Sequence, residues 1–216
     1  MTGGKEEGPM NNQQDDDRNL IWEPVKTEYL VRDAWMDLRK MTYRLPDGKL
    51  LDTIYTYSRR NYVIIVPEDE EGNYLCVRQF RYGIGTVTTD FPAGCIEGAE
   101  GARYVSDANR GITMEDALAT AQRELQEETG YSSENWKHLM TIPSNATLAD
   151  NFAYLFSARQ CRRSGDRHLD ETEFLNTVKV SPAELDGLIR RGQFPQAMHV
   201  LAWLLVKQER EKSSTE

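Results

Sequence analysis

Residues 123–131 read RELQEETGY, and this stretch decides how the rest of the chain is interpreted. Glu124, Glu127 and Glu128 stand at i, i+3 and i+4, so a helix places their carboxylates on one face within one turn. Like charges at this spacing destabilise a bare helix by roughly 0.2–0.5 kcal/mol per pair. A divalent cation would use them as hard oxygen ligands, and a solvated acidic face is the alternative interpretation. Gly130 follows where a left-handed residue would end the helix.

A second motif lies upstream of this helix. Residues 91–100 read FPAGCIEGAE, in which Gly94 is followed after five residues by Glu100. Together the two segments resemble the Nudix box, which is a glycine, five residues, a glutamate, seven residues and then REUxEExGU, with U aliphatic or aromatic. Residues 101–122 separate Glu100 from Arg123, so the chain departs from the pattern by a 15-residue insertion.

A rival register of the box uses Glu115, which precedes Arg123 by seven residues. It places Asn109 at the glycine position and loses the Pro-Ala-Gly context, so the Glu100 register is preferred. The choice concerns only which glutamate precedes the helix.

The resemblance extends beyond the box. VRQFRY at residues 77–82, the Phe-Pro-Ala-Gly segment and DETE at residues 170–173 are similar to the ADP-ribose pyrophosphatase branch of the Nudix superfamily. The resemblance implies an α/β fold, namely a Nudix-type α/β/α sandwich with a mixed sheet, preceded by N-terminal strands. It also implies hydrolysis of the pyrophosphate bond of ADP-ribose or a related nucleoside diphosphate sugar. A GDP- or UDP-sugar substrate, or a non-catalytic nucleotide-binding regulator, is the alternative.

The resemblance assigns roles around the helix. It implies that Mg²⁺ or Mn²⁺ is held by Glu124 and Glu128, with Glu127 sharing or bridging, and by the backbone carbonyl of Ala93. Gly94 would let the loop approach metal and phosphate closely. Arg123 would pair with Glu100 and orient this loop on the helix.

The general base and the substrate contacts are expected outside the helix. The resemblance favours Glu171 as the base, with Glu173 as the alternative, although residues 170–173 read equally as an acidic turn before a strand. Arg81 is expected to contact phosphate or ribose, because a guanidinium binds phosphate bidentately. The remaining candidates for contact with metal or substrate are Arg78 and Glu97, and the candidates for stacking on a base are Trp35, Tyr55 and Tyr57.

Composition bounds the class of protein. The 216 residues carry 35 acidic and 26 basic side chains, a net charge of −9, which makes a nucleic-acid backbone an improbable partner. Cys76, Cys95 and Cys161 are scattered, which argues against a disulfide framework or a zinc site and fits a reducing cytoplasm. The longest apolar runs are far too short for a membrane span, so a cytoplasmic location is expected.

The chain is expected to divide into a disordered tail at residues 1–18, an N-terminal strand region at 19–58, the Nudix domain at 59–208 and a flexible tail at 209–216. The insertion at 101–114 has few apolar residues, which favours a solvent-exposed loop, and a segment that reshapes the pocket or acts as a lid is the alternative. By resemblance, the protein is expected to be a homodimer that exchanges the N-terminal strands. The histidines His138, His168 and His199 are interpreted as incidental.

Overall fold

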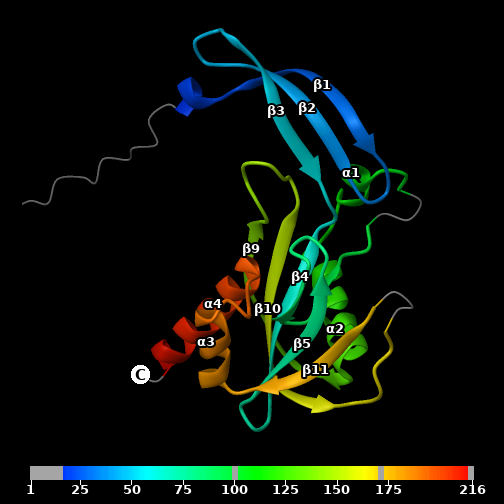
Figure 1. The fold of residues 1–216 in the computed structure, drawn as a ribbon, viewed down its shortest axis with the longest axis vertical. Helices are drawn as coiled ribbons and strands as arrows, with labels where there is room; N and C mark the ends of the chain where they lie inside the picture. The colour runs from blue at the N-terminus through cyan, green and yellow to red at the C-terminus, as the bar shows by residue number, and fades with distance from the viewer. Residues whose placement is uncertain (1–16, 99–101, 170–172, 214–216) are drawn as a thin grey trace, which may run out of the picture.

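The computed structural model describes residues 17–98, 102–169 and 173–213, and within them the strands form two sheets (Figure 1). The smaller sheet has the order β1-β2-β3, with β1 at Glu23–Arg32, β2 at Asp37–Arg44 and β3 at Leu50–Ser58. Neighbouring strands in it are antiparallel. The 3-10 turn η1 at Asp17–Leu20 precedes it.

The larger sheet has the order β11-β5-β4-β10-β8, with β6 paired to β5, β7 to β4 and β9 to β10. Its strands are β4 (Tyr62–Asp69), β5 (Tyr74–Arg81), β6 (Thr86–Asp90), β7 (Ala93–Cys95), β8 (Tyr131–Ser132), β9 (Asn135–Pro143), β10 (Phe152–Arg163) and β11 (Leu175–Val180). The β4–β10 pair is parallel and the other pairs are antiparallel, so the sheet is mixed, as expected.

Helices cover both faces of the larger sheet. Helix α2 (Met114–Thr129) lies on one face, and α3 (Pro182–Arg190) and α4 (Ala197–Ser213) lie on the other (Figure 1). This arrangement confirms the predicted α/β/α sandwich. No helix in the described part of the chain is both long and apolar enough to cross a membrane.

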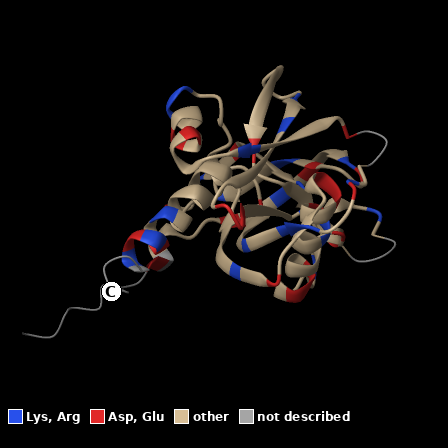
Figure 2. Cartoon of the chain, turned by 90° about the horizontal axis from the view of Figure 1, so that it is seen from below, with Lys and Arg blue, Asp and Glu red and all other residues tan. Residues whose placement is uncertain are grey.

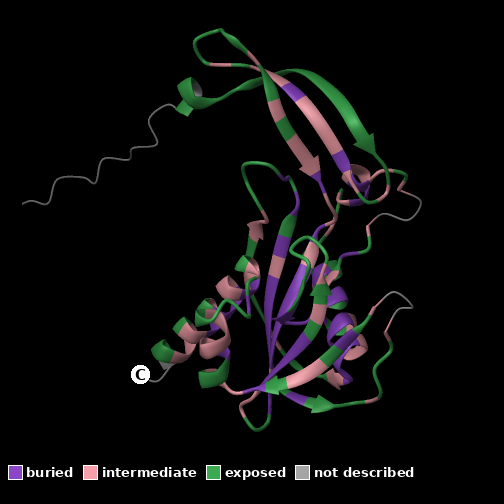
Figure 3. Ribbon diagram, viewed as in Figure 1, coloured by how far each residue is buried: buried purple, intermediate pink, exposed green. Residues whose placement is uncertain are grey.

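Strand β4 holds the two layers together. Because successive side chains of a strand point to opposite faces, Val63 and Ile65 pack into the core beneath α2, while Ile64 and Val66 pack into the core that contains Trp203 of α4. All four β4 residues are essentially inaccessible to solvent. The strand therefore reads as a continuous apolar run, and Figure 3 shows buried residues along the centre of the sheet.

The smaller sheet stands apart from the body and exposes much of its surface (Figure 3). It joins the body through a bridge between Tyr57 and Ala149 and through the ion pair of Arg39 with Asp150, at 2.8 Å. Large apolar side chains on it and just before it are exposed, namely Leu20, Ile21, Trp22, Val25, Tyr29, Leu30, Val31, Trp35, Leu50 and Tyr55. An apolar surface of this size is typical of a contact with another protein surface.

Local signals bound the helices, and the predicted helix end at Gly130 is confirmed. Thr113 and Asp116 form a reciprocal capping box at the start of α2, and Gly130 ends this helix with φ 75°. Ser181 caps α3 by accepting a hydrogen bond from the Glu184 amide, and Gly192 follows that helix with φ 68°.

The expected tail from residue 209 is wrong in its first part, because α4 continues to Ser213. The last turns carry charges of both signs, as Figure 2 shows near the C-terminus. These charges find partners on the sheet: Glu209 pairs with Lys137 at 2.7 Å, and Arg210 pairs with Glu68. The expected tail at 1–18 lies outside the described residues as far as residue 16.

The expectation of a solvent-exposed loop for the insertion is also wrong. Residues 105–108 form the short helix α1 (Val105–Ala108), and both Val105 and Ala108 are buried. A few apolar side chains suffice, because one turn of helix directs two of them to the same side.

We expect the two helix-terminal glycines to differ in their tolerance of alanine. Both have positive φ, so Gly192→Ala should lower the free energy of unfolding by about 1 kcal/mol from backbone strain alone. A Cβ at Gly130 would also stand 2.7 Å from the carbonyl oxygen of Gly165, so Gly130→Ala should cost clearly more. Urea denaturation of the two variants measures the difference, and equal losses would contradict this packing.

Candidate active site

The helix α2 and the strand β7 meet closely. Glu124 and Glu128 of α2 are 7% and 3% exposed, and β7 runs across their carboxylates. A Cβ added at Gly94 would lie 1.9 Å from Oε1 of Glu124, so any larger residue there requires the carboxylate or the loop to move. The amide of Ala93 donates a hydrogen bond to Oε2 of Glu128 at 3.2 Å. The structure thus brings together the sequence-predicted Ala93, Gly94, Glu124 and Glu128.

Arg123 neutralises part of this acidic cluster. Its Nη2 donates to Oε1 of Glu124 at 2.8 Å, and its Nη1 pairs with Oε2 of Glu127. Glu127 is half-buried. The expected partner Glu100 lies outside the described residues, so the predicted pair of Arg123 with Glu100 stays a prediction.

Burial and neighbouring carboxylates raise the pKa of both buried glutamates. The pKa of Glu128 lies well above its usual range, because burial and the charge of Glu124 disfavour its ionised form. Burial also raises the pKa of Glu124, against the opposing effect of Arg123. Two buried carboxylates this close are costly when both are ionised, and a nearby cation offsets that cost.

The donor set fits a hard divalent cation. Carboxylate oxygens and backbone carbonyls are the ligands that Mg²⁺ and Mn²⁺ prefer, and the glycine at position 94 leaves the backbone free to approach them. Within residues 17–98, 102–169 and 173–213, no three Asp, Glu, His or Cys side chains converge on one point as metal ligands. In this structure the Arg123 guanidinium pairs with both Glu124 and Glu127.

Glu173, the described residue of the late acidic segment, acts on the same cluster. The charge of Glu173 raises the pKa of both Glu124 and Glu128, which places this side chain within electrostatic reach of them. Glu171, the sequence-predicted base, lies outside the described residues. Both candidates for the base therefore stay open, with Glu173 close to the carboxylates.

A pocket of about 540 Å³ opens beside Ala93 and Gly94. Arg81 lines it, as expected, and its Nε donates to Oδ2 of the fully buried Asp90 at 2.7 Å. Other residues of its wall come from the smaller sheet, the connection to β4 and strand β7, namely Trp35, Tyr57, Arg59, Arg60, Tyr62 and Cys95.

Three of the predicted contacts lie elsewhere. Arg78 is exposed and lines a different hollow, between β6, β11 and α3. Glu97 is exposed and does not line the pocket, and the same is true of Tyr55. Arg78 differs from Arg81 because residues three apart on a strand point to opposite faces.

His199, interpreted from the sequence as incidental, is one of the residues that line the pocket. It is buried, its Nδ1 accepts a hydrogen bond from the Phe91 amide at 3.1 Å, and its ring stacks on that of Phe91. Burial, together with the charge of Arg81, lowers the pKa of His199 to about 3. The contact joins residues 108 apart in the chain, so no local pattern predicts it.

This histidine should make folding stability depend on pH. Its pKa is about 3 when folded and about 6.5 when unfolded, so between these values the unfolded chain binds one more proton and stability falls as pH falls. We expect wild type to lose about 1 kcal/mol more than His199→Asn between pH 6 and pH 5. An asparagine can still accept from the Phe91 amide and does not titrate. Urea denaturation at the two pH values gives the comparison, and parallel losses would show that His199 is not held neutral.

Comparison with known proteins agrees with this geometry. The family model of the NUDIX domain matches residues 58–204. The chain is 26% identical over 165 residues to an ADP-ribose pyrophosphatase of Bacillus subtilis, covering 76% of this chain and 80% of that protein. It is 24% identical over 185 residues to a methanol dehydrogenase activator of Bacillus methanolicus, covering 82% of this chain and 88% of that protein.

A solved structure shares the fold. The crystal structure of an ADP compounds hydrolase superposes with a TM-score of 0.67 at 19% sequence identity, covering 88% of this chain and 96% of that one. The matched family region contains both the Gly94 loop and the carboxylates of α2. The chain therefore belongs to the Nudix family and is a Nudix hydrolase of the ADP-ribose pyrophosphatase-like branch.

Proposed function

We propose that the protein hydrolyses the pyrophosphate bond of ADP-ribose or a related nucleoside diphosphate sugar, giving a nucleoside monophosphate and a sugar phosphate. The observation that carries this proposal is the contact of the Gly94 loop with the Glu124 and Glu128 carboxylates, beside a pocket of about 540 Å³. Similarity to an ADP-ribose pyrophosphatase supports the choice of substrate class.

The proposed ligands of Mg²⁺ or Mn²⁺ are the Ala93 carbonyl and the carboxylates of Glu124, Glu127 and Glu128. Such ions, when bound, neutralise the pyrophosphate and hold the attacking and leaving oxygens. Arg123, paired with Glu124 and Glu127 in this structure, would keep their side chains oriented. Arg123 is thus proposed to position ligands and not to contact the reacting atoms.

Glu171 is the proposed general base, with Glu173 as the alternative. The general base takes a proton from a water molecule while the water oxygen forms a bond to one phosphorus. The bond between this phosphorus and the bridging oxygen breaks, and the bridging oxygen leaves with the other phosphate. Glu173 lies near the carboxylate cluster, which favours a role for this acidic segment as a whole.

The substrate pocket suits a nucleotide. Arg81 is proposed to bind a phosphate or ribose oxygen, since it lines the pocket and Asp90 fixes the direction of its side chain. Trp35 and Tyr57 also line the pocket and provide aromatic surface on which the nucleobase of the substrate would stack. No described residue separates ADP-ribose from GDP- or UDP-linked sugars, so these remain the alternative substrates.

A homodimer is proposed as the form in solution. The exposed apolar side chains of η1, β1, β3 and the connections at 21–22 and 33–36 lie on or beside a sheet that stands away from the body (Figure 3), and a second copy of the chain would cover them. Sedimentation velocity should give about twice the chain mass, and Trp22→Glu should shift the distribution towards single chains. A wild-type protein that sediments as a single chain at all concentrations would contradict the dimer.

Removal of one ligand charge tests the reaction. Glu128→Gln keeps the shape of the side chain and should lower kcat for ADP-ribose at least about 100-fold, because the charge that holds the metal and phosphates is lost. The matched control is Glu115→Gln, an exposed glutamate in the first turn of the same helix, which should keep kcat within about twofold.

Product analysis by chromatography, with Mg²⁺ and then with EDTA, completes this test. AMP and ribose phosphate should form only with metal. A loss of activity in Glu115→Gln would instead favour the rival register of the motif. Binding of a nucleotide sugar without any cleavage would contradict the proposed hydrolysis.

A further inference from the structure

The inserted segment packs against the walls of the substrate pocket. Its described part, residues 102–114, includes the short helix α1, whose Val105 and Ala108 are buried. It contacts three separate stretches: the β3–β4 connection at 59–61, the turn at 32–36 and the segment that follows β7. Residues of all three stretches, or directly adjoining them, line the pocket.

Asn109 holds the first of these stretches. Its Nδ2 donates to the carbonyl of Arg59 at 2.8 Å, and its Oδ1 accepts from the amide of Asn61 at 2.9 Å. One side-chain amide thus bridges both sides of Arg60. Residues 59–61 belong to neither β3 nor β4, and Asn151 also donates from Nδ2 to the Arg60 carbonyl at 3.1 Å, so side chains from two segments hold this connection.

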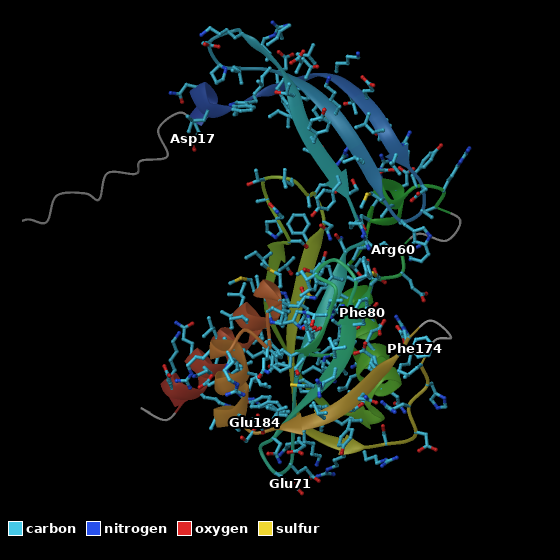
Figure 4. All side chains as sticks on the ribbon, viewed as in Figure 1. Asp17, Arg60, Glu71, Phe80, Phe174 and Glu184 are labelled. Carbon is cyan, nitrogen blue, oxygen red and sulfur yellow. The ribbon has the colours of Figure 1, made fainter. Side chains whose placement is uncertain are left out.

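The β3–β4 connection carries two positively charged side chains that are available to bind an anionic ligand. Arg59 and Arg60 are half-buried and line the pocket, and neither forms an ion pair within the described part of the chain. Nε of Arg60 is buried without a hydrogen-bond partner. Figure 4 shows Arg60 where the smaller sheet joins the body. Guanidinium groups in this state favour an anionic ligand.

The second stretch is held by the residues before α1. The amide of Val105 donates to the carbonyl of Asp33 at 3.0 Å, and the guanidinium of Arg32 lies 3.9 Å from the centre of the Tyr104 ring. Oδ1 of Asp33 in turn accepts from the amide of Trp35, whose side chain lines the pocket. The insertion thereby fixes the turn that presents this tryptophan.

The third stretch follows the metal-binding loop. A Cβ at Gly98 would lie 2.1 Å from the carbonyl oxygen of Ala108, so the chain beyond β7 is pressed directly against α1. This contact fixes the position of Gly98, at the end of the segment that begins with Ala93 and Gly94.

We propose that the inserted segment is a positioning element for the outer wall of the substrate pocket, with Asn109 as the residue that holds Arg59 and Arg60 in place. This inference rests on the proposed function for the identity of the ligand, a nucleoside diphosphate sugar. The contacts of Asn109 reach the pocket wall and not the carboxylates of α2. Asn109 therefore governs how tightly the substrate is held, and the rate of the chemical step depends on other residues.

The test compares Asn109→Ala with Arg110→Ala, an exposed neighbour whose ion pair is with Asp107 of the same segment. Loss of the two hydrogen bonds should raise KM for ADP-ribose by about 3–10-fold and leave kcat within about twofold, because binding is weakened equally in ground and transition states. Arg110→Ala should match wild type in both constants. Hydrogen–deuterium exchange of the Asn61 amide, measured without ligand, should be faster in Asn109→Ala alone.

A second variant covers the case in which Asn109→Ala does not fold. Tyr104→Leu removes the contact with Arg32 at a half-exposed site and should raise KM about 2–3-fold at unchanged kcat. An unchanged KM in variants that fold, or a fall in kcat alone, overturns the proposal.

Failure of the proposed function is distinguishable. If the wild-type protein cleaves no nucleoside diphosphate, the kinetic constants cannot be compared. Hydrogen–deuterium exchange at the Asn61 amide then tests the positioning role of Asn109 without any substrate. Faster exchange at Asn61 in Asn109→Ala upholds the positioning role, and unchanged exchange overturns it.

Discussion

The close approach of Gly94 to Glu124 is the constraint on which the site depends. A Cβ at position 94 would displace the Glu124 carboxylate or the loop, and the Ala93 amide reaches Glu128 one helical turn further along. Strand β7 is held there by its pairing with β4, which is buried on both faces. The core of the sheet thereby fixes the position of the loop over the helix.

The same contact makes the site costly for the fold. Glu124 and Glu128 are both taken out of water, and burial raises the pKa of each carboxyl, with the charge of Glu124 raising that of Glu128 further. Burying unpaired carboxylates destabilises a protein by several kcal/mol, and Arg123 offsets only the part that involves Glu124 and Glu127. A divalent cation would bring Glu128 the same compensation, so ligand binding and stability are linked at this site.

The sequence predicts an interaction well when the residues involved are close together along the chain. The caps of α2 and α3 and the face shared by the three glutamates depend on residues at most four apart, and they were predictable. The support of Phe91 by His199, the hold of Asn109 on residues 59–61 and the burial of Val105 depend on tertiary packing between distant segments. The low apolar content of the insertion favoured a solvent-exposed loop. Two buried side chains are nevertheless enough to pack the insertion against the rest of the protein. Glu100 and Glu171, two of the predicted site residues, lie outside the described residues.

The measurement that tests the central claim most directly is Mn²⁺ binding by Gly94→Ala, followed by electron paramagnetic resonance beside wild type. An added Cβ would force Glu124 and the loop apart, so the variant should fold yet bind Mn²⁺ at least about tenfold more weakly. Far-ultraviolet circular dichroism checks that the fold is kept. A folded Gly94→Ala protein that binds Mn²⁺ as tightly as wild type would show that the metal does not depend on this contact, and the site would have to be placed elsewhere.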